Sequence, residues 1–140
     1  MPRFNKNNIN ELKEFLYNSC AHDAKLKNAQ YDYGADSLKI KLYNPIFNTK
    51  IDLTFLNIVT ALSIKGEWSG NRETIISLTA EEDFSYLRNY LPKYSECINN
   101  SLYLLFQMFS GDELHIVSKE VIVETQEKNN KNTGDGSVCD

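Results

Sequence analysis

Two histidines are the first residues in this 140-residue chain to consider for chemistry. His22 is followed by Asp23, and a carboxylate beside an imidazole can fix its tautomer and raise its basicity. Neighbours on an extended segment point to opposite faces, however, so the plainer interpretation is a connector whose aspartate caps a turn. His115 follows a turn that begins at Ser110. If the fold brought the two imidazoles together, they could serve a small hydrolase or, with Cys20 or carboxylates, hold zinc.

The usual signatures of catalysis and cofactor binding do not occur in the sequence. It has no P-loop, dinucleotide fingerprint, H-E-x-x-H motif or EF-hand loop. Ser110 lacks the G-x-S-x-G context of a nucleophile elbow, and a hairpin turn explains it more simply. We therefore predict no catalytic residues, no metal and no cofactor.

Residues in predicted turns offer a surface for recognising a partner. Gly66 and Gly70 bracket Trp68, and Arg72 follows, so this loop could present an aromatic ring and a guanidinium. The alternative is a tryptophan packed over the end of a sheet, with glycines that only turn the chain. Carboxylates at strand ends could add charge complementarity. The predicted partner-binding residues are Asp32, Asp36, Glu67, Trp68, Arg72, Asp112 and Glu113.

Two helices are predicted to help position these residues. The first has an apolar stripe at helical spacing over residues 9–16 and begins at Asn8, which would form a capping box with Glu11. The second follows an acidic start, with Thr79 as its cap, and ends at Pro92.

Strands occupy most of the remaining chain. Changes in alternation near Asn28 and near Ser118 each predict a β-bulge. Residues 56–64 are apolar on both parities, which favours a strand covered on both faces over the alternative of a helix. Short turns imply antiparallel pairing. We predict an α+β fold with a single antiparallel, largely meander sheet of about six strands, an N-terminal helix and one helix between strands four and five. The predicted strands are residues 24–33, 38–43, 49–64, 74–79, 102–109 and 113–125.

Composition indicates the number of domains and the environment of the chain. Hydrophobic residues make up 41% and the net charge is -4, so a core can form and direct nucleic-acid binding is disfavoured. Residues 1–125 are predicted to form one α+β domain, and residues 126–140 a disordered polar tail. Three cysteines without C-x-x-C spacing favour reduced thiols. No stretch is apolar enough to span a bilayer or act as a secretion signal, so we expect a cytoplasmic protein without membrane contact.

Several short patterns occur in an order that can be compared with known families. They are Cys20-Ala-His-Asp-Ala24, Tyr31-Asp-Tyr33, Leu38-Lys-Ile-Lys-Leu42, Ile51-Asp-Leu-Thr-Phe55, Gly66-Glu-Trp68 and Ser110-Gly-Asp-Glu-Leu-His-Ile116. Over residues 9–124 this order resembles the YxiG-like group of small bacterial proteins. The resemblance implies no established activity. It implies a genomic setting near cell-wall-associated polymorphic toxins, where small acidic proteins often act as immunity factors.

These observations favour a non-enzymatic protein-binding module. The specific role we expect is that of an acidic immunity-type protein that neutralises a bacterial toxin domain. One alternative is a small hydrolase or metal-dependent enzyme using His22 and His115. Another is a structural homodimer formed through a sheet edge, so the chain is expected to be a monomer or a homodimer.

Overall fold

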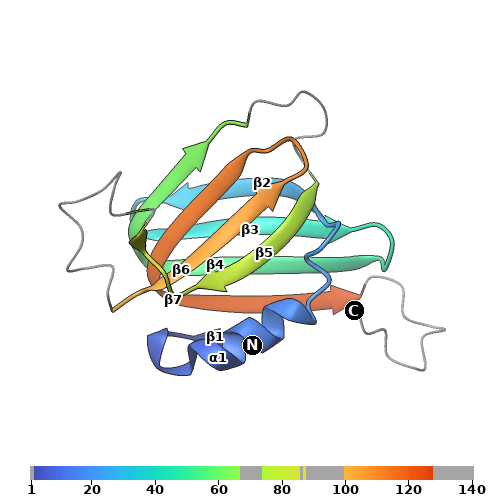
Figure 1. Ribbon diagram of the computed structural model, residues 1–140. Coiled ribbons are helices and arrows are strands. Elements are labelled where there is room, and N and C mark those ends of the chain that lie inside the picture. Colours follow the sequence, from blue (N-terminus) through green and yellow to red (C-terminus); the bar gives the residue numbers. More distant parts are fainter. Residues whose placement is uncertain (1, 67–73, 86, 88–99, 128–140) are drawn as a thin grey trace.

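The computed structural model describes residues 2–66, 74–85, 87 and 100–127, and the structural statements below concern these residues. Their elements follow one another along the chain in Figure 1. They are β1 (Arg3–Phe4), the short 3-10 helix η1 (Lys6–Asn8), α1 (Ile9–Tyr17), β2 (Lys25–Asp32), β3 (Ser37–Asn44), β4 (Thr49–Ile64), β5 (Ile75–Glu81), β6 (Leu102–Met108) and β7 (Glu113–Glu127).

All seven of these strands belong to one antiparallel sheet. The order is β2-β3-β4-β7-β6-β5, and β1 pairs with β7. Two three-stranded meanders, β2-β3-β4 and β5-β6-β7, are thus joined through the pairing of β4 with β7. The antiparallel sheet is confirmed. The prediction of six strands in a largely continuous meander is wrong in detail, because β5 lies at the edge of the sheet and not beside β4.

The sheet bends so that its two meanders face each other. Figure 1 shows β5, β6 and the first part of β7 crossing in front of β2 and β3, with α1 below. Across the interior, the rings of Phe55 in β4 and Phe106 in β6 have centroids 6.5 Å apart. The inner core also takes in Ile9, Leu12 and Leu16 of α1, which therefore closes one side of the bent sheet.

The bend coincides with the predicted irregularity near Ser118. In a regular strand, an even-numbered and an odd-numbered residue face opposite sides of the sheet. Leu114 and Val121 nevertheless both pack in the inner core, so the alternation of β7 changes between them. The register of the β4–β7 pair shifts between Ile58 and Thr60, beside Ser118, and places the extra residue in β4. The other predicted bulge is confirmed by a register shift in β2 between Leu26 and Asn28.

A second, smaller core lies on the outer face of β6 and β7. It contains Phe84, Leu87, Tyr103 and Val117, with Val59, Leu62 and Leu105 packed against it. Strand β6 is therefore covered on both faces. The predicted double cover of residues 56–64 is also seen in part, because Ile58 joins the inner core and Val59 the outer one.

The predicted helix caps were wrong in detail. Helix α1 begins after Asn8 as expected, but the Asn8 side chain does not cap it. Its Oδ1 instead accepts a hydrogen bond from the backbone N–H of Asn5 at 2.7 Å, in a capping box at the start of η1. Thr79 is not a helix cap, because it lies inside β5. The first part of the second predicted helix is also wrong, because residues 80–81 belong to β5 and residues 82–84 are not helical. Ser85 and Leu87 are helical, and residues 86 and 88–92 lie outside the described residues.

The two edge strands of the sheet meet at their first residues. Lys25 of β2 forms an isolated antiparallel bridge with Thr74, just before β5. Beside it, the N–H of Ile75 donates to the carbonyl of Ala24 at 2.8 Å, and the N–H of Asp23 donates to the carbonyl of Ile75 at 2.9 Å. The connector, which is the segment of residues 18–24 between α1 and β2, is thereby attached to the start of β5.

Strand β7 continues to Glu127, two residues past the predicted domain boundary at 125. The remainder of the predicted tail lies outside the described residues. In the part of the chain that is described, no helix has the length and apolar character needed to cross a membrane.

Candidate functional site

The first pair of predicted binding carboxylates lies in the β2–β3 hairpin. Asp32 Oδ1 accepts the N–H of Gly34 at 3.0 Å, and Asp36 accepts the hydroxyl of Tyr31 at 2.6 Å. The hydrogen bond to Asp36 stabilises the protonated phenol and raises the pKa of Tyr31 above its ordinary value. Both carboxylates therefore help to shape the hairpin.

The second pair lies where β7 begins, at a separate place on the sheet. Asp112 Oδ1 accepts the N–H of Gly66 at 2.5 Å, next to the end of β4. The β2–β3 hairpin meets β4 at Asn57, seven residues before Ile64, which pairs with Glu113. At about 3.3 Å per residue, the two turns are roughly 20 Å apart along the strand. They do not form one acidic patch.

The remaining predicted binding residues are Glu67, Trp68 and Arg72. All three lie outside the residues that the structure describes.

The two histidines lie in different surroundings. The His22 side chain is 71% exposed, and its Nδ1–H donates to the carbonyl of Ile76 at 2.7 Å. Asp23 has a φ of 69°, and this left-handed backbone brings its carboxylate to 3.4 Å from His22 Nε2. Residues 22–23 form a turn, so the condition under which the two side chains would point apart, an extended segment, is not met. His115 is only 2% exposed and lies on the outer face of the sheet.

His115 belongs to a buried polar chain that the sequence did not indicate. The Tyr103 hydroxyl lies 2.5 Å from His115 Nδ1, and His115 Nε2–H donates to Glu113 at 2.9 Å. The rings of Phe84, Tyr103 and His115 stack in succession, with centroids 5.5 and 5.7 Å apart. Tyr103 is 2% exposed, so its phenol is not accessible to a substrate.

His22 is thus an exposed residue beside the start of β5, whereas His115 is buried between Tyr103 and Glu113. Among the described residues, no group of three or more His, Cys, Asp or Glu side chains could hold a metal ion.

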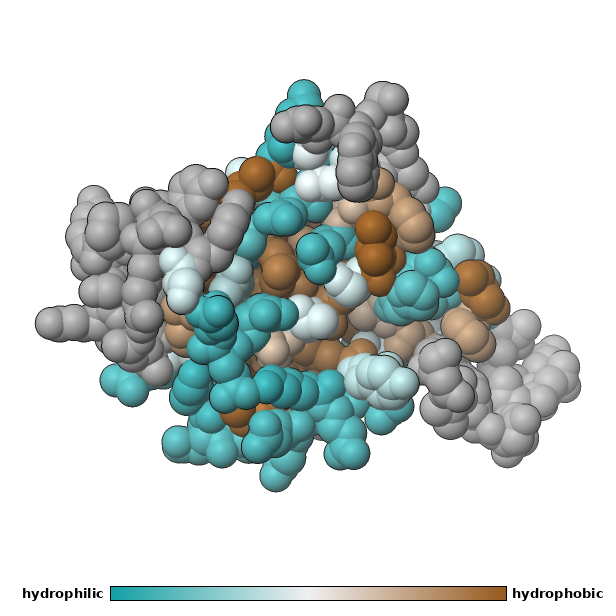
Figure 2. Space-filling view, viewed as in Figure 1, coloured by the Kyte–Doolittle hydropathy of each residue, from teal (hydrophilic) through white to brown (hydrophobic). Residues whose placement is uncertain are grey.

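An apolar groove of about 530 Å³ lies between the end of α1, the connector, the β3–β4 turn and the start of β5. Four large hydrophobic side chains line it and are nevertheless exposed: Tyr17 by 77%, Ile46 by 67%, Phe47 by 41% and Ile76 by 37%. Figure 2 shows hydrophobic surface gathered on the right of this face, over the β3–β4 turn and the start of β5. We call this feature the apolar groove.

Asn44 holds two walls of the apolar groove together. It is fully buried at the end of β3. Its amide nitrogen donates to the carbonyls of Cys20 at 2.9 Å and His22 at 3.1 Å. Its amide oxygen accepts the N–H groups of Ile46 at 2.9 Å and Phe47 at 3.2 Å. One side chain thus fixes the connector against the β3–β4 turn.

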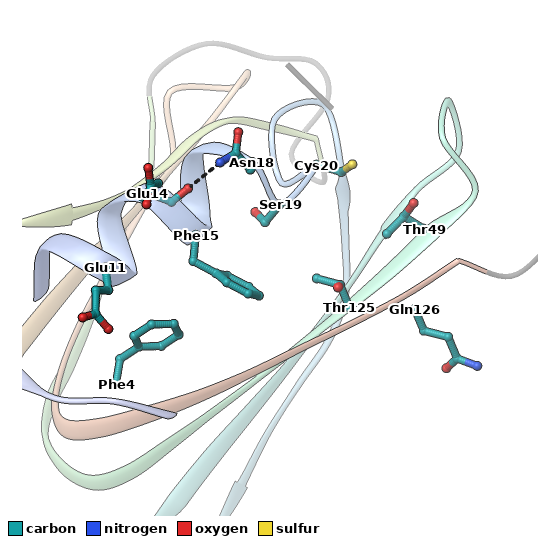
Figure 3. A pocket seen from close by; sticks show the side chains of 10 residues that line it. All are labelled: Phe4, Glu11, Glu14, Phe15, Asn18, Ser19, Cys20, Thr49, Thr125 and Gln126. Carbon is teal, nitrogen blue, oxygen red and sulfur yellow. Dashed lines mark hydrogen bonds between the residues drawn. The ribbon is translucent and has the colours of Figure 1, made fainter. Parts of the chain in front are cut away.

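A second hollow, of about 710 Å³, lies between α1, the start of β4 and the end of β7. We call it the acidic hollow, because Glu11 and Glu14 line it without any basic residue. Figure 3 shows the rings of Phe4 and Phe15 between the helix and β7, and their centroids are 5.5 Å apart. Cys20 lines both this hollow and the apolar groove, so the two features adjoin at the C-terminal end of α1.

The charges around α1 favour a positively charged ligand. Its last turn contains no basic residue, so the negative end of the helix dipole has no cation from that turn beside it. Glu11 and Glu14 add two carboxylates on the hollow side. Aromatic faces such as that of Phe15 also attract cations. A lysine or arginine side chain from another molecule matches this combination.

Cys20 takes part in a disulfide bond, which contradicts the expectation of reduced thiols. The other two cysteines, Cys97 and Cys139, lie outside the described residues.

Sequence reasoning missed the residues of the apolar groove because four separate segments bring them together. A weak signal was present in Ile46 and Phe47, an apolar pair inside an otherwise polar turn. Another was Ile76, since the adjacent Ile75 and Ile76 cannot both face the core of a regular strand. Tyr17 gave no signal beyond its place at the end of the helical stripe.

The chain matches no protein-family model, and no curated protein matches it. Its function must therefore be argued from the surface itself.

Proposed function

We propose that this chain is a non-enzymatic protein-binding module that docks its partner around the C-terminal half of α1. The observation that carries the proposal is the junction of the apolar groove with the acidic hollow at Cys20. One surface thereby offers a hydrophobic cleft and a negatively charged cleft side by side.

The apolar groove supplies the binding energy in this proposal. Exposed large hydrophobic side chains that gather around a concavity are typical of interaction sites, whereas single ones need no explanation. Tyr17 and Phe47 are aromatic, and buried aromatic anchors dominate the energetics of many protein interfaces. Asn44 keeps the groove walls in place before binding, which lowers the cost of ordering them.

In this proposal the acidic hollow orients the partner and raises the rate of association. A basic side chain next to an apolar one on the partner would match the two clefts together. The net charge of -4 would attract such a partner over a longer range.

The more specific proposal is an immunity-type protein that neutralises a bacterial toxin domain. It is supported by the YxiG-like resemblance and by the suitability of an acidic surface for a basic toxin. In this proposal Asp32, Asp36, Asp112 and Glu113 contribute general negative charge rather than direct anchors. The Cys20 disulfide favours an oxidising compartment, so the cytoplasmic location expected from the sequence stays a prediction.

The test uses any toxin domain that the reading frames adjacent to the gene for this chain encode. The full chain is co-expressed with that domain, and both growth of the cells and the affinity of the purified pair are measured. We expect Phe47→Asp in the apolar groove and Glu14→Lys in the acidic hollow each to weaken binding at least about tenfold. Phe109→Asp is the matched control, because Phe109 is 46% exposed but lines neither cleft.

Varying the salt concentration separates the contribution of the apolar groove to binding from that of the acidic hollow. Binding should weaken as ionic strength rises, and this dependence should be shallower in Glu14→Lys than in Phe47→Asp. Absence of association and of protection at every salt concentration would refute the toxin proposal. Equal effects of Phe47→Asp and Phe109→Asp on a real complex would refute the assignment of the surface.

A further inference from the structure

Strand β2 is exposed along most of its length. Lys25 and Leu26 are half-buried, whereas all residues from 27 to 32 are exposed. Ala29 and Tyr31 pair with Ile40 and Leu38 of β3, and Ile40 is fully buried in the inner core. They therefore lie on the core face of the sheet without being covered.

The outer edge of β2 is also open to pairing. Among the described residues, β2 pairs with β3 on one side. On its other side, one isolated bridge joins Lys25 to Thr74. The register shift after Leu26 leaves residues 28–32 as a regular stretch. An exposed regular edge is a template for another strand, unless charges or bulges block it. In β2, Lys27 and the bulge lie at one end of this edge. Within the regular stretch of residues 28–32, Asp32 is the single charged residue.

The sequence of this stretch is complementary to itself in the antiparallel direction. With Gln30 opposite Gln30 of a second copy, Asn28 lies opposite Asp32, and Ala29 lies opposite Tyr31. A carboxylate thereby faces an amide donor, and a large ring faces a methyl group on the core face. Beyond these pairs, Lys27 of one copy lies beside Asp32 and Tyr33 of the other, so the charges also match.

The Tyr31 ring is already held in position for such a contact. Its hydroxyl donates to Asp36 at 2.6 Å, and its ring packs edge-on against Tyr33 with centroids 4.5 Å apart. Fixing the ring beforehand reduces the entropy lost on association.

We propose that this chain forms a symmetric dimer in which residues 28–32 of β2 pair antiparallel with the same residues of a second copy. Gln30 lies on the two-fold axis, and the two bent sheets join edge to edge. This contact is the self-complementary kind that a two-fold axis requires. It uses neither the apolar groove nor the acidic hollow, so it stands or falls independently of the proposed partner.

The first test is the mass of the full chain by light scattering over about a hundredfold range of concentration. We expect the mass to rise from 16.1 kDa toward twice that value. Ala29→Asp places a carboxylate against the Tyr31 ring and should raise the dimer dissociation constant at least about tenfold. Ala35→Asp is the matched control, because Ala35 is an exposed alanine beyond the paired stretch. Circular dichroism establishes that both variants are folded.

The second test reads the register directly. Opposed Cα atoms of an antiparallel pair lie about 4.5–5.5 Å apart, which is within the range that a disulfide can bridge. Gln30→Cys should therefore form a covalent dimer on mild oxidation, well above the background of the parent chain. Asn28→Cys is the control, since its own equivalent in the second copy would be about 13 Å away along the strand.

A mass of 16.1 kDa at every concentration would overturn the proposal. A dimer that tolerates Ala29→Asp, or that cross-links as readily through Asn28→Cys as through Gln30→Cys, would equally overturn it.

Discussion

Asn44 illustrates how a single buried amide can organise a surface made from distant segments. Its four hydrogen bonds satisfy two carbonyls of the connector and two N–H groups of the β3–β4 turn. In sequence it is recognisable only as the residue before Pro45, at a strand end. Nothing in that context reveals that the amide reaches back more than twenty positions to Cys20 and His22.

Asn44→Ala should destabilise the fold by about 2–4 kcal/mol, because the substitution leaves buried backbone groups without this partner. Denaturant unfolding followed by circular dichroism measures the change. The comparison is Asn28→Ala, at an exposed position, which should alter stability by no more than about 0.5 kcal/mol. Equal effects of the two substitutions would show that the Asn44 hydrogen bonds are not needed for stability.

The histidines show what residue types can and cannot reveal. The sequence directs attention to His22 and His115, but their contacts depend on register and backbone conformation. Tyr103 reaches His115 because β6 pairs with β7, a register that no local pattern fixes. Asp23 reaches His22 because its φ is positive, which is uncommon for a residue other than glycine.

At the scale of elements, Gly66 joins the end of β4 to the β6–β7 turn. A Cβ atom at Gly66 would lie 2.3 Å from the carbonyl carbon of Gly111 and 2.4 Å from the carbonyl oxygen of Ser110. Both are backbone atoms, so the turn itself would have to move. The glycine is needed here because two backbone segments of the chain approach each other closely.

Gly66→Ala should therefore destabilise the fold by about 1–3 kcal/mol through overpacking. It should also weaken the hydrogen bond from Gly66 to Asp112. Gly34→Ala is the matched control, because its nearest contact would be Asp32 Oδ1 at an ordinary 3.5 Å. Thermal unfolding of both variants measures the difference, and similar melting temperatures would contradict the close approach.

The contact between α1 and the segment after β5 should respond to pH. The Lys13 ammonium donates to the Glu82 carboxylate, and this hydrogen bond and charge hold the pKa of Glu82 below its ordinary value. A lowered pKa in the folded state means that the stabilisation is present above the ordinary pKa of glutamate. It is then lost as the pH falls through the folded value.

Carboxyl NMR titration should thus find Glu82 titrating lower in the parent chain than in Lys13→Ala. The effect should shrink at high salt, because both side chains are largely exposed. Lys39→Ala is the control, because Lys39 is not one of the charges that lower the pKa of Glu82, and it should leave the Glu82 titration unchanged. An unchanged Glu82 titration in Lys13→Ala would contradict the ion pair.

Several elements could be predicted because their side-chain patterns are local. The stripe of α1 and the alternation of β3 follow from periodicity, and the long strand β4 follows from an uninterrupted apolar run. Strand β1 could not be predicted, because two residues are too few to show an alternation of side chains. They form a strand because β7 lies beside them. Thr79 was misread as a cap because an acidic cluster follows it, although β5 continues to Glu81.

At the scale of the whole molecule, the order of the strands in the sheet could not be predicted from the sequence. Turn lengths indicate which neighbours form hairpins, but the pairing of β4 with β7 joins residues more than sixty positions apart at Phe55 and Val121. The apolar groove depends on this same closure, because β5 reaches α1 and the connector only once the sheet has bent. Fold class was therefore predictable, and the site was not.

The disulfide at Cys20 makes a prediction about the entire chain. With three cysteines and one bond within a single chain, one thiol should react with an alkylating reagent under denaturing, non-reducing conditions. Mass spectrometry counts the adducts, and a reduced sample provides the control with three. Three adducts without reductant would instead support the cytoplasmic location that we expected from the sequence.

Strand β7 pairs with β1, β4 and β6, all of which precede it in the chain. During synthesis on the ribosome, the first meander emerges with the edge of β4 unpaired, and it stays so until β7 is translated. Nascent chains that stall before β7 therefore expose a sixteen-residue edge to aggregation or to chaperones. Completion of the part of the sheet that the structure describes therefore waits for β7.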